Sequence, residues 1–122
     1  MIRPMYFVMC TALMVSPCLL PRFQRRYAAF PVLLGAAGFL RDKRATTHPA
    51  EYDALRPYCA EVVAKRIVDA GNVITAGGVT SAIDVGLYVV ERLAGPDVRH
   101  KIARQMDYPY ALPPDSVVTP RP

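Results

Sequence analysis

The sequence predicts an α/β domain with a binding site where its strands end, and two segments support this. A β-type run over 73–76 ends in the double glycine Gly77-Gly78, and residues with free hydroxyls open a helix directly afterwards. A second β-type run ends in Thr46-Thr47-His48. Open α/β sheets bind ligands where strands end and helices begin, so both segments are candidate parts of a site.

Size and composition allow one globular domain. The 122 residues can bury a core, and 52% of them are hydrophobic while 20% are charged. The net charge of +5 comes from scattered basic residues without interleaved aromatic side chains. This pattern favours a solvated basic surface over a nucleic-acid partner.

Cysteine and histidine usage indicates neither a disulfide framework nor a metal site. The three cysteines are Cys10, Cys18 and Cys59, an odd number without framework spacing, which fits a reducing cytoplasm. His48 and His100 are isolated, and no Cys-x-x-Cys or His-x-x-x-His spacing occurs. We therefore expect no metal and no cofactor.

Residues 1–27 form an apolar and then basic segment whose nature the sequence leaves open. As a secretory signal, it lacks a clear small-x-small cleavage site. As a membrane span, it is short and broken by Pro17, so membrane association is disfavoured. It can also be an ordinary strand and helix, or replace the normal beginning of a domain through an alternative start or altered reading frame.

The first elements after this segment are a helix, a strand and a short helix. Residues 28–40 are apolar almost all round, which predicts a helix lying against a sheet, with Gly38 near its end. Residues 44–47 are expected to form a short strand. A short helix over 49–55 should end at Pro57.

A hairpin-like pair of strands follows. The pattern predicts one strand over 59–68 and another over 73–76, joined by the turn residues 69–72.

Two helices and a tail complete the chain. Apolar residues at helical spacing predict a helix over 81–93, and Ser81 with Asp84 resembles a capping box. A further helix is expected over 97–106. Residues 107–122 are rich in proline and tyrosine, which favours an extended tail.

Five motifs in order then suggest a family. They are Leu33–Leu40, Arg44–His48, Gly71–Thr75, Gly77–Asp84 and Gln105–Tyr110. Together they strongly resemble the ThiJ/PfpI family of the class I glutamine amidotransferase-like superfamily. Within it, the sequence looks most similar to isonitrile (cyclohexyl-isocyanide) hydratases and to the sensor domains of AraC-type regulators.

The resemblance implies part of a flavodoxin-like sandwich. It places the C-terminal part of the family domain at 28–110, after the non-matching segment 1–27 and before a Pro-rich tail over 111–122. It also implies a cytoplasmic homodimer and a cysteine-dependent hydratase, a lyase. In such a site, a cysteine lies on a strand-to-helix elbow. The helix N-terminus lowers the pKa of its thiol and supplies N–H groups to an oxyanion, and an acidic partner tunes or shares its proton.

The reactive centre of that family is not found at its expected place. The family's layout puts the cysteine at Ala28, within Tyr27-Ala28-Ala29-Phe30-Pro31, and its acidic partner before Met1. We therefore expect a truncated relative of isonitrile hydratase, inactive as written. The alternative is a non-catalytic module for ligand sensing or dimerisation, like the corresponding domain of AraC-type regulators.

Individual residues keep more than one interpretation. His48 is expected to be the family's site histidine, or else a strand-end residue that anchors the turn before Pro49. Gly78, Thr80 and Ser81 are candidates for binding a small-molecule ligand, although both hydroxyl residues would also cap the helix.

Three further residues are expected to be structural. We predict that Cys59 is a buried structural thiol and that Asp84 caps its helix. Cys10 lacks the glycine that a nucleophile elbow needs, so we do not expect it to be the nucleophile.

Overall fold

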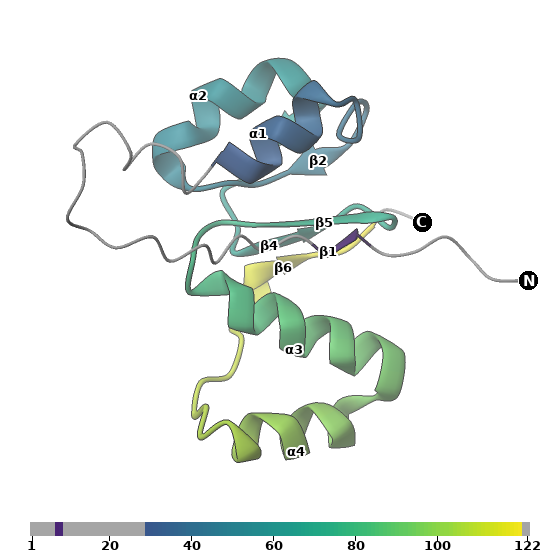
Figure 1. The fold of residues 1–122 in the computed structure, drawn as a ribbon, viewed down its shortest axis with the longest axis vertical. Helices are drawn as coiled ribbons and strands as arrows, with labels where there is room; N and C mark the ends of the chain where they lie inside the picture. The colour runs from purple at the N-terminus through teal and green to yellow at the C-terminus, as the bar shows by residue number, and fades with distance from the viewer. Residues whose placement is uncertain (1–6, 9–28, 121–122) are drawn as a thin grey trace, which may run out of the picture.

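A computed structural model of the chain describes residues 7–8 and 29–120. A sheet lies between two helical layers (Figure 1). Helices α1 (Ala29–Ala36) and α2 (Tyr52–Leu55) cover one face, and α3 (Ser81–Ala94) lies against the other. Helix α4 (Pro96–Gln105) packs outside α3. This layering confirms the expected α/β class.

The sheet is mixed. Among the described residues it has four strands, in the order β1 (Phe7–Val8), β5 (Val73–Ala76), β4 (Ile67–Asp69) and β6 (Val117–Val118). Strand β5 is parallel to β1 and antiparallel to β4, while β6 runs parallel to β4. A separate parallel pair joins β2 (Arg44–Ala45) to β3 (Glu61–Val62).

The expected hairpin is present between β4 and β5. Val68 lies opposite Thr75, and the turn closes with a bond from the Ala70 N–H to the Val73 carbonyl at 2.9 Å. Gly71 has φ of 92°, a left-handed conformation that glycine adopts without a Cβ clash. The Asp69 carboxylate accepts the Gly71 N–H at 2.7 Å and holds this turn.

The expected single strand over 59–68 is wrong. The Val63 N–H still follows β2 by donating to the Ala45 carbonyl at 2.9 Å. The Lys65 N–H then donates to the Val63 carbonyl at 2.8 Å, a tight turn that redirects the chain. The segment therefore supplies β3 to the small sheet and β4 to the large one.

Helix α1 is shorter than expected because it ends in a Schellman motif. Gly38 has φ of 87°. Its N–H donates to the Gly35 carbonyl at 2.8 Å, and the Phe39 N–H donates to the Leu34 carbonyl at 3.0 Å. Residues 37–42 continue as turns rather than as helix.

The remaining segments follow the sequence prediction except at the C-terminal end. The segment 49–58 forms a short 3-10 turn (η2, Pro49–Glu51), α2, and a second 3-10 turn (η3, Arg56–Tyr58) that includes Pro57. Helices α3 and α4 lie where 81–93 and 97–106 predicted them. The expected tail instead holds a 3-10 turn (η4, Pro114–Ser116) and strand β6, which pairs with β4.

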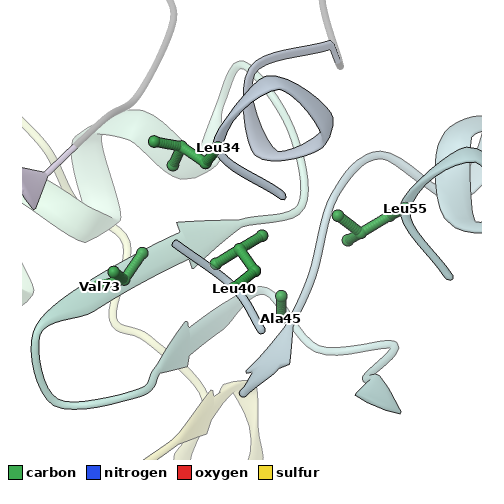
Figure 2. Packing of buried hydrophobic residues seen from close by; sticks show 5 residues of the cluster. All are labelled: Leu34, Leu40, Ala45, Leu55 and Val73. Carbon is green, nitrogen blue, oxygen red and sulfur yellow. The ribbon is translucent and has the colours of Figure 1, made fainter. Parts of the chain in front are cut away.

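Two apolar clusters form the core. The first joins both sheets to the α1 side of the molecule and comprises Leu34, Leu40, Ala45, Leu55 and Val73 (Figure 2). Leu40 is fully buried and lies among the others, between the α1 turn and the strands. The second cluster, formed by Ile67, Ile74 and Val85, packs α3 onto the opposite face.

A buried carboxylate adds a polar contact to this second interface. Asp69 is 1% exposed and accepts hydrogen bonds from the Tyr88 hydroxyl at 2.8 Å and from the Arg92 guanidinium. Burial, together with the bond to Asp69, raises the pKa of Tyr88 to about 12. The neutral phenol is therefore the form that binds α3 to β4.

We expect Leu40→Ala to lower the free energy of unfolding by about 2–5 kcal/mol, because it opens a cavity in a fully buried site. Urea unfolding followed by circular dichroism measures the change. Leu93→Ala is the matched control, since Leu93 is 68% exposed, and its effect should stay within about 0.5 kcal/mol. Equal losses in the two variants would contradict the described core.

The Tyr88 hydroxyl should stabilise the fold in a pH-dependent way. Its pKa is higher in the folded chain than the ordinary value of 10, so its contribution is complete below about pH 10 and is lost as the pH rises through about 12. Wild-type and Tyr88→Phe proteins are compared by urea unfolding from about pH 9 to about pH 12. The stability difference between them should shrink over this range, and a constant difference would refute the assignment.

Candidate functional site

The end of β5 approaches the backbone of two other segments closely. The Gly77 N–H donates to the Arg66 carbonyl at 3.0 Å. A Cβ on Gly77 would lie 3.5 Å from the Lys65 carbonyl oxygen and 3.7 Å from that of Thr47. These are ordinary van der Waals distances, so β5 ends directly beside the segment that leads to His48.

The segment before His48 is fixed against β5 by hydrogen bonds. Thr46 and Thr47 are completely buried. The Thr46 N–H donates to Thr75 Oγ1 at 2.9 Å, and Thr46 Oγ1 donates to the Lys65 carbonyl at 3.0 Å. These bonds fix the point at which the chain passes from the buried threonines to the exposed His48.

His48 and Gly78, which belong to the two candidate site motifs of the sequence, lie close to each other at the surface. A Cβ on Gly78 would lie 3.9 Å from His48 Cδ2. The His48 side chain is exposed and caps η2, because its Nδ1 accepts the Ala50 N–H at 3.2 Å. In the neutral ring the proton is then on Nε2, which becomes a hydrogen-bond donor beside the glycine turn.

The expected side-chain caps of α3 are wrong. Thr80 occupies the N-cap position with φ −68° and ψ −22°, and its side chain makes no capping bond. A capping oxygen reaches the helix N–H groups from an extended conformation, which Thr80 does not have. Thr80 Oγ1 instead accepts from Arg66 Nη2 at 3.3 Å. Ser81 is buried, while Thr80 is exposed near Gly78 in the chain.

Asp84 has a different role from the expected cap. It is 3% exposed, and its carboxylate accepts from Arg66 Nε at 2.5 Å and from the Tyr108 hydroxyl at 2.9 Å. Burial, together with the bond to Asp84, raises the pKa of Tyr108. This cluster of Arg66, Thr80, Asp84 and Tyr108 ties the start of α3 to the segments before β4 and after α4.

No pattern in the sequence indicated a role for Arg66 or Tyr108. Tyr108 was part of the motif 105–110, but nothing in that motif indicated its partner. Arg66 lies 18 positions before Asp84 and on another element, so periodicity along one helix or strand cannot connect them.

Cys59 is less buried than the buried structural thiol that we expected, although it packs against apolar residues. It is partly buried against the first apolar cluster, and its Sγ contacts the Leu55 carbonyl oxygen at 3.6 Å. Burial raises the pKa of the thiol, which disfavours the nucleophilic thiolate. Cys10 and Ala28 lie outside the described residues.

Residues 7–8 and 29–120 contain no cluster of three or more His, Cys, Asp and Glu side chains that could hold a metal ion. Nor does this part of the chain contain a helix that is both long and apolar enough to cross a membrane.

Comparisons with known proteins agree with the motifs. The chain is 44% identical over 85 residues to isonitrile hydratase of Pseudomonas putida, covering 70% of this chain and 37% of that protein. It is 30% identical over 82 residues to Protein DJ-1alpha of Drosophila melanogaster, covering 67% and 38%. The chain thus spans less than two fifths of the length of these curated relatives.

Solved structures show the same relationship. A THiJ/PfpI family protein from Pseudomonas syringae superposes with a TM-score of 0.64 at 32% identity, over 72% of this chain and 36% of that one. Oxidized DJ-1 of Toxoplasma gondii gives 0.55 at 28% identity, over 68% and 45%.

The family match itself covers residues 28–92, which is more than half of the 122 residues. It includes His48, the glycine turn and the start of α3. The chain belongs to the DJ-1/PfpI family, also called ThiJ/PfpI.

Proposed function

We propose that the chain carries the ligand-binding side of an isonitrile hydratase-like site, and that it binds a small isonitrile without converting it. The observation that carries this proposal is the approach of the His48 ring to Gly78, where a Cβ would lie 3.9 Å from His48 Cδ2, in a chain 44% identical over 85 residues to an isonitrile hydratase. Gly78 and Thr80 are assigned to the ligand side of this site, whereas the buried Ser81, whose N–H donates to the Gly78 carbonyl at 3.1 Å, is assigned to the turn itself.

The chemistry of an isonitrile fits a neutral hydrogen-bond donor. Its terminal carbon carries a lone pair, so an N–H group can donate to it. His48 Nε2 can supply this donor while Nδ1 remains bound to Ala50. Thr80 is exposed beside the turn and adds a hydroxyl.

Hydration would add water across the isonitrile carbon to give an N-substituted formamide, and it needs an activated nucleophile. No cysteine lies within 27–31, where the family's layout expects one. Cys59 does not replace it, because burial favours its neutral thiol and Leu55 is its contact. Binding without turnover is therefore the proposed outcome.

Titration of the purified chain with cyclohexyl isocyanide tests both halves of this proposal. We expect saturable NMR shifts of the His48 ring and the Gly78 amide, and no N-cyclohexylformamide above a protein-free blank. His48→Ala should weaken binding about two- to tenfold, the usual value of one hydrogen bond.

His100→Ala is the control histidine, and it should leave the titration unchanged. Absence of saturable shifts would overturn the binding assignment. Formamide production above the blank would overturn the absence of turnover.

We also propose that the chain is a cytoplasmic protein and self-associates as a homodimer. Exposed apolar side chains on and after α1, Leu33 and Phe39 among them, support association. Size-exclusion chromatography with light scattering should give twice the chain mass of 13.5 kDa. A monomer at all concentrations would contradict this.

A further inference from the structure

A second candidate site lies away from His48, between α4 and the segment that follows it. This segment leaves the end of α4 and returns toward the sheet (Figure 1). An open cavity of about 590 Å³ lies there, lined by α4 side chains and by residues 108–111. Its volume is within the range of about 300–1,000 Å³ that small-ligand sites occupy.

Positive charge dominates the lining. Arg99, Lys101 and Arg104 line the cavity, against one carboxylate, Asp97. Arg99 Nε lies 3.1 Å from Glu91 Oε2 but has no acceptor in hydrogen-bond geometry. Within the part of the chain that the structure describes, Lys101 and Arg104 form no salt bridge. Lys101 and Arg104 are therefore the cations of the cavity that no salt bridge to a described residue neutralises, whereas Arg99 is paired with Glu91.

Two tyrosines form the other side of the cavity. The rings of Tyr108 and Tyr110 meet edge to face, with centroids 5.3 Å apart and an interplanar angle of 68°. The bond from Tyr108 to Asp84 fixes the first ring. The second ring is open to solvent, because Tyr110 is 68% exposed. An exposed ring held by a fixed neighbour is available for stacking.

We propose that this cavity binds a small planar aromatic anion, an aryl phosphate or an aryl carboxylate. The cations alone would accept any anion, and the exposed ring alone would accept any flat apolar group. Their combination within one cavity favours a ligand that carries both features. An anionic group would contact Lys101 and Arg104, and its ring would stack on Tyr110.

NMR titrations of the full chain with phenyl phosphate and with benzoate test the proposal. We expect saturable shifts over residues 99–111 with at least one of these probes. Inorganic phosphate and benzyl alcohol, which lack the ring or the charge, should bind at least tenfold more weakly. The stronger of the two aromatic anions identifies the preferred anionic group.

Variants locate the site. Lys101→Gln combined with Arg104→Gln should weaken binding of the aromatic anion at least tenfold, and Tyr110→Ala should weaken it severalfold. Arg41→Gln removes an exposed charge far along the chain and should have no effect. The proposal is overturned if neither aromatic anion binds, if inorganic phosphate or benzyl alcohol binds as well, or if Arg41→Gln matches the double variant.

Discussion

The buried Asp84 carboxylate is the contact on which the arrangement of this chain depends. A carboxylate without partners would be costly in a buried position, and here an arginine and a tyrosine from two other segments supply hydrogen bonds. Arg66 belongs to the segment whose carbonyl also receives the Gly77 N–H. Tyr108 belongs to the wall of the α4 cavity. One buried charge thus connects both candidate sites.

Helix α3 takes part in two clusters in which a buried carboxylate is bound by an arginine and a tyrosine. Asp84, Tyr88 and Arg92 are spaced by four residues and therefore lie on one face of the helix. Asp84 is paired with Arg66 and Tyr108, while Tyr88 and Arg92 together bind the buried Asp69 of β4. Such pairs are specific because removing one partner leaves a buried charge, which typically costs about 3–5 kcal/mol. They add directional contacts to the apolar packing of Val85 on Ile67 and Ile74.

In the candidate site, the contacts that hold the backbone in place are distinct from the group that would carry out a reaction. Buried threonines and a glycine turn bring His48 to Gly78, and these contacts are part of the fold itself. The family relationship explains why this framework exists in the chain. At this framework, His48 Nδ1 accepts the Ala50 N–H, whereas the thiol of Cys59 packs against the core.

Local sequence patterns determined the elements whose signals are complete within a few residues. Helix α3 and the β4–β5 hairpin follow from periodicity and turn residues, whereas the approach of His48 to Gly78 joins segments 30 positions apart. Tertiary structure alone decided that 59–68 divides between two sheets, that β6 pairs with β4, and that Asp84 binds Arg66 and Tyr108 rather than capping its helix. These outcomes depend on hydrogen-bond partners distant in the chain, and no local pattern specifies which buried donor meets which acceptor.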